Sequence, residues 1–520
     1  MDTEVVRSLD PPTSVDVGYA EQSAQQWWEA MADSCAALGK HVESIQAIAL
    51  SGQMQGVLLV DAHGEPILPA LLYSDSRARA EAAHLEEKLG QERLLRGVQN
   101  WKGAVSVLPK LCWLHHHCPD LLERANHILL GAHDWLFFRL TGLAVTDLTN
   151  ASVSGLLRAD KDEWAFQLLL DAGLPASIAA KLPELATGGP AVAFLLPAAA
   201  SRLRLSRGSN IKVCHGAGDL GTTTRGALGE RSVGTYCYLG TSGWVATQRS
   251  TISEQERGRA FCVLGASRER RYLLAAPMTT AGGNLRWLLG VMWPGLPESD
   301  AYVELESEAS NAPPGCGGVL YLPYLSGERC PVKDPQARAC FIGMGVGTTR
   351  GILCRAVMEG ICFAMRSLLE LLPGEHLAHG AKHGVLAATN QANISEDDGH
   401  KIELPPPPLV VVGGVAASRT VVQTLANVMQ REVHVPSAFL HAPALGAAWL
   451  AFEAINDAEG ENEDDVERLK PSSPNDVDFK DTSLVLLPDS ELKEMYDTRY
   501  RAFCMLHPAL RETFPLLRAR

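Results

Sequence analysis

The sequence predicts an α/β protein with at least two domains. Strand-like runs of valine, isoleucine and leucine alternate with helical segments along most of the chain, which is typical of α/β folds. The chain has 520 residues, more than one hydrophobic core usually serves. One buried-strand pattern ends in a carboxylate, Asp219, set among glycines, and a second glycine turn follows at 240–243.

The first half begins with strand-like runs at 45–50 and 57–60 and continues with helical segments, of which 110–122 is the clearest. A stretch rich in alanine, proline and leucine at 183–206 separates this half from the next. We therefore place the first domain at 1–210.

The second half alternates strands and helices, and we place the second domain at 211–455. Its expected elements are a strand from Ile211 to the glycines before Asp219, a hairpin at 235–247, helices at 281–289 and 349–372, a strand at 409–412 that runs into Gly413 and Gly414, and a helix at 419–430.

Two segments differ from this pattern. Residues 374–408 are polar and end in four prolines, which predicts a surface insertion. Residues 456–481 carry ten acidic and three basic side chains, so we expect 456–520 to form an acidic loop followed by a helical tail.

Composition excludes several classes of protein. The net charge of −14 disfavours nucleic-acid binding, which needs a basic surface. The 12 cysteines are scattered singly without a C-x-x-C pair, as expected for free thiols in a reducing compartment. No apolar run is long enough for a membrane span, and the first residues lack targeting features. We therefore expect a cytoplasmic protein.

The two glycine turns predict phosphoryl transfer to an alcohol. Glycines let backbone N–H groups approach an anion closely, as the turn at 240–243 would require. Asp219 at a strand end can accept the proton of a hydroxyl group. One anion cradle and one base are what this chemistry needs, so the pattern indicates a small-molecule kinase.

Other interpretations of these turns stay open. Residues 216–221 match G-x-G-x-x-G, but the acidic residue expected of a dinucleotide site does not follow, and a purely structural turn is the stronger alternative. The turn at 240–243 also fits an ordinary hairpin. Gly413 and Gly414 suit either a nucleotide lying on bare backbone or a plain strand–helix turn. No Walker A pattern is present.

Three adjacent histidines, at 115–117, raise the question of a metal site. Successive residues on a helix point about 100° apart, so three neighbours do not converge on one ion. We expect a solvated helix face. Neither G-x-S-x-G nor H-E-x-x-H occurs, so hydrolase interpretations have no support.

Ordered motifs across about 12–514 resemble the FGGY family of carbohydrate kinases, and within it the kinases of xylulose. The matching segments are 51–56 (SGQMQG), 72–77 (LYSDSR), 134–142 (DWLFFRLTG), 146–152 (TDLTNAS), 216–219 (GAGD), 239–243 (LGTSG), 322–329 (LPYLSGER), 334–338 (DPQAR), 413–414 (GG) and 443–448 (PALGAA).

The resemblance implies two actin/hexokinase-like (ribonuclease H-like) domains with an inter-domain cleft where ATP and sugar meet. It implies that D-xylulose is converted to D-xylulose 5-phosphate with ATP and Mg²⁺. It also assigns site residues: Asp219 as general base, Met54, Gln55, Asp75 and Asp219 as sugar contacts, Gly240, Thr241 and Ser242 as the phosphate turn, and Gly283, Gly413, Gly414 and Ser418 as ATP-binding positions, with no metal ligand.

The chain departs from the family pattern at three places. Gln55 stands where a histidine is usual, and Leu220 stands where an asparagine usually follows the base. The opening strand and its D-x-G-T phosphate turn are also absent, so we expect the first domain to lack its opening strands and this chain to have little activity and poor solubility.

Three hypotheses remain: a xylulose kinase, a kinase of another ketose such as ribulose, and a sugar-binding pseudoenzyme. Expected partners are the sugar and ATP, with no nucleic acid and no membrane, and a homodimer is left open.

Overall fold

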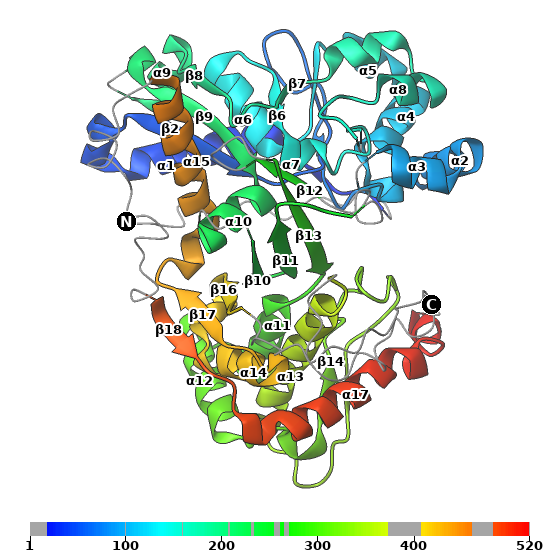
Figure 1. Cartoon of the computed structure of the whole chain (residues 1–520), viewed down its shortest axis with the longest axis vertical. Coiled ribbons are helices and arrows are strands. Elements are labelled where there is room, and N and C mark those ends of the chain that lie inside the picture. The colour runs from blue at the N-terminus through cyan, green and yellow to red at the C-terminus, as the bar shows by residue number, and fades with distance from the viewer. Residues whose placement is uncertain are drawn as a thin grey trace, which may run out of the picture. The chain divides into compact units, whose positions relative to one another are not determined.

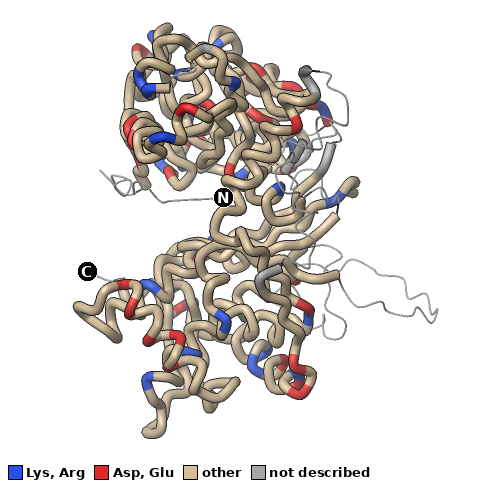
Figure 2. Tube along the Cα trace, turned by 90° about the vertical axis from the view of Figure 1, so that its left-hand side faces the viewer, with Lys and Arg blue, Asp and Glu red and all other residues tan. Residues whose placement is uncertain are grey.

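The computed structural model describes residues 18–518 apart from 99, 159, 206–207, 230–232, 254–260, 265–269, 373–406 and 460–481. The chain divides into two compact units (Figure 1). Unit 1 comprises Met1–Ser232, Arg249–Leu273 and His441–Asn475, and unit 2 comprises Val233–Gln248, Leu274–Leu440 and Asp476–Arg520. Figure 2 shows acidic and basic residues interspersed along the described trace of each unit.

A three-stranded sheet forms the centre of unit 1, with the order β2-β9-β8. Strand β9 (Lys212–Gly218) is buried along most of its length and lies parallel to β2 (Ala47–Gly52) and antiparallel to β8 (Val192–Phe194). Among the described strands, β2 pairs with β9 alone. The pairing with β2 reaches Gly218 at the end of β9, whereas β8 pairs only with Lys212–Cys214, so it is β2 that holds the end of this strand.

Smaller elements complete unit 1 around two hydrophobic clusters. The paired strands are β1 (Glu21–Gln22) with β4 (Ala70–Leu71), β3 (Leu58–Val60) with β5 (His127–Leu129), and β6 (Val145–Asp147) with β7 (Glu184–Ala186). The helices before β9 are α1 (Ala24–Ala37), α2 (Arg79–Leu89), α3 (Gln91–Gly97), α4 (Val107–His117), α5 (Pro119–Arg124), α6 (Ala132–Thr141), α7 (Leu148–Ala151), α8 (Phe166–Asp171) and α9 (Pro197–Leu203).

Helix α10 (Asp219–Leu228) follows β9 directly and packs against α15 (Ala442–Glu459), a helix from far along the chain (Figure 1). Two glycines allow this close approach. A Cβ atom on Gly226 would lie 1.9 Å from the carbonyl oxygen of Ala442, and one on Gly446 would lie 1.9 Å from that of Thr222. The backbones of the two helices are therefore in direct contact, with no side chain between them.

The sheet of unit 2 has the order β13-β11-β10-β16-β17-β18, and β12 (Phe261–Leu264) pairs with the part of β13 that belongs to unit 1. Strands β10 (Gly234–Leu239) and β11 (Gly243–Arg249) form a hairpin, and β16 (Leu409–Val412) lies parallel to both β10 and β17 (Val433–Pro436). The remaining strands are β13 (Arg270–Met278), β18 (Thr482–Leu486) and the pair β14 (Leu320–Leu322) and β15 (Cys340–Ile342).

Five long helices belong to unit 2: α11 (Gly282–Met292), α12 (Glu298–Asn311), α13 (Arg350–Leu369), α14 (Arg419–Met429) and α17 (Lys493–Leu510). Helix α13 is the most buried of them and packs against α12, α14 and β14. Thr349 caps it by accepting a hydrogen bond from the N–H of Ile352, which is why the helix begins at this residue.

The predicted elements correspond closely to the observed ones in the second half, where β16 coincides with the predicted strand at 409–412 and α13 and α14 lie within the predicted helices. The predicted single helix at 110–122 is wrong. It is two helices, because Cys118 leaves the helical conformation (φ −138°, ψ 49°) and Pro119 begins α5.

The two contact units differ from the ranges expected for the domains. Unit 1 continues past residue 210 because β9 is the middle strand of its sheet, and it also includes α15. All but the last two residues of the expected insertion at 374–408, and most of the acidic stretch, lie outside the described residues. In the described part of the chain, no helix has both the length and the apolarity needed to cross a membrane.

The glycine contact between α10 and α15 gives a stability prediction. We expect Gly226→Ala to lower the free energy of unfolding by about 1–3 kcal/mol, because the new methyl group must push the helices apart. Gly290→Ala in the exposed part of α11 is the matched control, since nothing lies within 4 Å of the added atom. It should be neutral or stabilising by about 0.5–1 kcal/mol. The midpoint of urea unfolding measures both effects. Equal midpoints for Gly226→Ala and Gly290→Ala would show that the two helices are not in close contact at Gly226.

Candidate functional site

Asp219 is the first residue of α10, directly after the buried strand β9. Its Oδ1 accepts a hydrogen bond from the N–H of Leu220 at 2.8 Å, and Oδ2 has no partner among the described residues. Burial raises the pKa of Asp219 to about 6, the charge of Asp147 adds to this, and the Leu220 N–H and His133 oppose it. A carboxylate with a free oxygen and a pKa near neutrality is suited to accept a proton.

Met54 lies against the residue that precedes Asp219. A Cβ atom on Gly218 would lie 2.2 Å from the sulfur of Met54, so a larger residue at this position would displace the side chain of Met54. The structure therefore brings two of the predicted site residues, Met54 and Asp219, to the same end of β9.

Gln55 follows Met54 in a left-handed conformation, with φ of 62°. A non-glycine residue in this region is strained, and the surrounding contacts must hold it there. Its N–H donates to Oδ1 of Asn150 at 2.9 Å, and its carbonyl oxygen accepts from Nζ of Lys110 at 3.1 Å. The side-chain Nε2 is buried without a hydrogen-bond partner in the described structure.

Lys110 is fully buried in α4 and ties two loops together. Besides the carbonyl of Gln55, its Nζ donates to the carbonyl of Leu72 at 2.7 Å. Burial lowers the pKa of Lys110 to about 7, with Asp75 opposing this shift and Arg77 adding to it. The sequence does contain a signal for Lys110, because a lysine on the apolar face of a helix usually has a specific partner.

Asp75 is fully buried, and both of its oxygens are engaged. Arg77 donates to Oδ1 from Nε at 3.0 Å and to Oδ2 from Nη2 at 2.7 Å, while the N–H groups of Ala20 and Arg77 supply further hydrogen bonds. Asp75 could reach a substrate only if these partners moved away.

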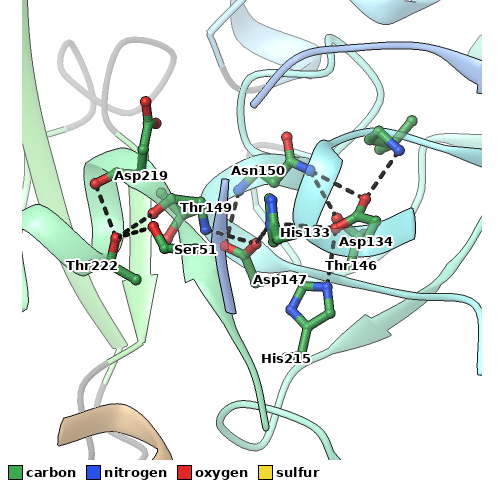
Figure 3. A network of polar contacts seen from close by, with 12 residues as sticks. Ser51, His133, Asp134, Thr146, Asp147, Thr149, Asn150, His215, Asp219 and Thr222 are labelled. Atoms are coloured by element: carbon green, nitrogen blue, oxygen red, sulfur yellow. Dashed lines mark hydrogen bonds and ion pairs between the residues drawn. The ribbon is translucent and has the colours of Figure 1, made fainter. Parts of the chain in front are cut away.

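A buried polar network lies behind the end of β9 (Figure 3). His133 Nε2 donates to Oδ2 of Asp147 at 2.8 Å, and His215 Nε2 donates to Oδ1 of Asp134 at 3.0 Å. These four side chains are the group of potential metal ligands in the described residues. The arrangement does not fit Mg²⁺, because two of the four donors are nitrogens and every carboxylate oxygen is already hydrogen-bonded.

In unit 2 the turn at 240–242 docks on the beginning of α11. The carbonyl of Gly240 accepts from the N–H of Gly282 at 2.8 Å, and the carbonyl of Thr241 accepts from the N–H of Gly283 at 3.0 Å. In the described structure, the N–H groups of Thr241 and Ser242 have no partner. Two free N–H groups in a glycine turn are suited to bind phosphate oxygens.

Among the other predicted nucleotide positions, Gly413 lies next to β10, the strand that leads into this turn. Gly413 has φ of 99°, and a Cβ atom there would lie 2.6 Å from the carbonyl oxygen of Leu239. Gly414 has open space on its Cβ side apart from Leu440. Ser418 caps α14 through Val421 N–H, and its hydroxyl also donates to Oε2 of Glu306 at 2.5 Å, so this hydroxyl is occupied.

The predicted residues thus form two groups. Met54, Gln55 and Asp219 come together in unit 1, whereas the predicted glycine positions and Thr241 come together in unit 2. Asn150, Asp147, His133 and Lys110 were not predicted. The first two lie in the segment 146–152, whose match to the family pattern did not show what they contact.

Two family models match the chain. The model of the FGGY family of carbohydrate kinases, N-terminal domain, matches residues 8–226, and that of the C-terminal domain matches residues 235–455. The xylulose kinase of Escherichia coli (strain K12) is 28% identical over 499 residues, which cover 95% of this chain and 91% of the relative. The xylulose kinase of Bacillus subtilis (strain 168) is 28% identical over 438 residues, which cover 84% and 80%.

Solved structures agree on the fold. Ligand-bound xylulose kinase from Lactobacillus acidophilus has a TM-score of 0.76 at 22% identity and covers 98% of this chain and 93% of its own. Plasmodium falciparum glycerol kinase with ADP has a TM-score of 0.71 at 18% identity, with coverages of 94% and 90%. The predicted α/β fold with two actin/hexokinase-like domains is confirmed.

Lys110 gives the prediction of this subsection. Lys110→Met should lower the free energy of unfolding by about 1–3 kcal/mol, because the carbonyl of Gln55 loses its donor and the carbonyl of Leu72 keeps only the N–H of Asp75. Lys88→Met on the exposed face of α2 is the control and should change it by less than about 0.5 kcal/mol. Urea unfolding followed by circular dichroism measures both. Equal stability of the two variants would show that Lys110 does not hold the loops.

Proposed function

The chain belongs to the FGGY family of carbohydrate kinases, and from this premise we propose that it phosphorylates a ketopentose, D-xylulose being the preferred candidate. It is a sugar phosphotransferase, and the product would be D-xylulose 5-phosphate. The choice of sugar is supported by curated relatives that are named xylulose kinases. The choice of base rests on the carboxylate of Asp219, with its free oxygen and raised pKa, beside Met54.

In the proposed reaction, Asp219 takes the proton from the sugar hydroxyl as the hydroxyl oxygen attacks the terminal phosphorus of ATP. The bond between that phosphorus and the bridging oxygen breaks, and ADP leaves. Met54 and Gln55 would contact the sugar, because their turn lies against the strand end that carries the base. Asp75, the other predicted sugar contact, is held by Arg77 and would reach the sugar only after this partner moved away. Phosphoryl transfer depends mostly on positioning and on stabilising charge, so a rigid strand end is suited to carry the base.

We assign nucleotide binding to the glycine positions of unit 2. The free N–H groups of Thr241 and Ser242 would bind phosphate oxygens, and the bare backbone at Gly283, Gly413 and Gly414 would leave room for the nucleotide. Ser418 would contribute as the cap that fixes the start of α14. Mg²⁺ would bind as the partner of the nucleotide phosphates, since the described cluster of potential ligands does not suit it.

Asp219→Ala should lower kcat by about 10²–10⁴-fold while sugar affinity changes little, because the general base is lost but the turn at Met54 stays. The wild-type kcat/KM should fall about tenfold per pH unit below about pH 6, where Asp219 becomes protonated. A coupled ADP assay and calorimetric sugar titration measure these effects, with the exposed Asp160→Ala as control. Near-normal turnover by Asp219→Ala would refute the assignment.

The choice of sugar is tested at Gln55 and Leu220. Gln55→His should raise kcat/KM for D-xylulose, and adding Leu220→Asn should raise it further. Gln55 follows Met54, which lies against Gly218, and Leu220 directly follows Asp219, so the two effects can couple. The assay compares D-xylulose, ribulose and other ketoses for the parent and both variants. A parent that prefers ribulose, with no gain for xylulose in the double variant, would assign that sugar instead.

A further inference from the structure

We propose that the buried network of His133, Asp134, Asp147 and Asn150 positions both halves of the sugar site. Asp147 holds the strand end that carries the base, and Asn150 holds the turn at Gln55. The catalytic part of this inference rests on the proposed function. None of the four is assigned a contact with the substrate, so each is a positioning residue.

On the side of the base, Asp147 acts through the backbone. It is the last residue of β6, and its Oδ2 accepts the N–H of Gly218 at 3.1 Å. Its Oδ1 accepts the N–H of Asn150 at 3.1 Å and so caps α7. Because Met54 closes the other side of Gly218, the peptide before Asp219 has little freedom to shift. The position of the base therefore depends on the carboxylate of Asp147.

A second contact fixes the base from the other side. The hydroxyl of Thr222 bonds to the backbone carbonyl of Asp219 at 3.2 Å and to the hydroxyl of Ser51 on β2 at 2.7 Å (Figure 3). The side chain of Asp219 points away from these contacts. The carboxylate is thus held through its backbone and keeps its own oxygen free.

On the side of the sugar, Asn150 links the turn to the same network. Its Oδ1 accepts the N–H of Gln55, and its Nδ2 donates to Oδ2 of Asp134 at 3.2 Å and to the hydroxyl of Thr146 at 3.2 Å. Both ends of the amide are therefore engaged, which fixes its orientation. The strained backbone of Gln55 needs such a partner to stay in its left-handed conformation.

His133 joins the two sides. Its Nε2 lies 2.8 Å from Oδ2 of Asp147 and 3.3 Å from Oδ1 of Asp134, and all three side chains are almost or completely buried. Burial opposes charge on each group. Even so, Asp134, Asp147 and Asp219 raise the pKa of His133, and the hydrogen bond and charge of His133, together with the charge of His215, lower that of Asp147. The buried carboxylates are therefore compensated inside the network, as buried charges must be.

The network differs from an ordinary structural cluster because its two branches end on backbone N–H groups of the proposed sugar site. One branch ends on the N–H of Gly218 next to the base, and the other ends on the N–H of Gln55 in the sugar turn. These segments are far apart in sequence, and β6, α6 and α7 bring them to one network. A loss on one branch should therefore change a different kinetic constant from a loss on the other.

The test measures kcat and KM for the best sugar in two variants with matched controls. Asp147→Asn should lower kcat about 10–100-fold with sugar KM within about threefold, because a small misplacement of the base slows the chemical step. Asn150→Ala should raise sugar KM about tenfold with kcat within about threefold, because the turn is no longer preorganised. The exposed substitutions Asp160→Asn and Asn126→Ala should leave both constants unchanged.

Amide hydrogen exchange gives a readout that does not need turnover. Exchange in 216–221 should rise at least tenfold in Asp147→Asn, and exchange in 53–57 should rise at least tenfold in Asn150→Ala, with the remaining core protected. This readout separates the inference from the proposed function, since it applies even if no sugar is phosphorylated. The inference would be overturned if the two variants changed kcat and sugar KM to the same extent. It would also be overturned if exchange at these segments stayed unchanged.

Two His133 variants keep the test decisive if Asp147→Asn does not fold. His133→Gln retains an N–H donor toward Asp147 and should keep kcat within about threefold of wild type. His133→Leu removes the donor and should lower kcat about 10–100-fold, since Asp147 then lacks its partner. Equal kcat in these two variants would mean that the network plays only a structural part.

Discussion

The hydrogen bond from the N–H of Gly218 to the buried carboxylate of Asp147 holds the backbone at the point where β9 ends and α10 begins. Other contacts of unit 1 hold the same strand end or the helix that follows it. The sheet places β9 between two neighbours, Met54 closes the side of Gly218, and α15 packs directly on the helix that follows. Asp219 on this strand end keeps its position while Oδ2 of its carboxylate has no partner among the described residues.

In unit 2, glycines rather than buried charges hold the turn at 240–242 in place. The beginning of α11 donates its N–H groups to the turn at 240–242, and Gly413 lies so close to Leu239 that a side chain would not fit. This packing leaves the N–H groups of Thr241 and Ser242 unpaired among the described residues. Anions are bound well by backbone N–H groups held in this way, because little reorganisation is needed when they bind.

Much of this could be predicted from local patterns. Apolar runs, caps and glycine turns predict β16, α13 and the hairpin, because the physical cause of each lies within a few residues. The break at Cys118 was missed because helical periodicity continues across it. The roles of Asn150 and Lys110 could not be predicted, since each contacts Gln55 across a long sequence separation. Asp75 was recognised from its motif, whereas its saturation by Arg77 is visible only in the structure.

In the proposed reaction, Asp219 meets a sugar hydroxyl beside the turn at Met54 and Gln55. The most direct test is a crystal structure with D-xylulose and a non-hydrolysable ATP analogue. We expect a sugar hydroxyl within about 3.2 Å of the free oxygen of Asp219, with the sugar in contact with Met54 and Gln55. A sugar bound elsewhere, with Asp219 facing only solvent, would contradict it.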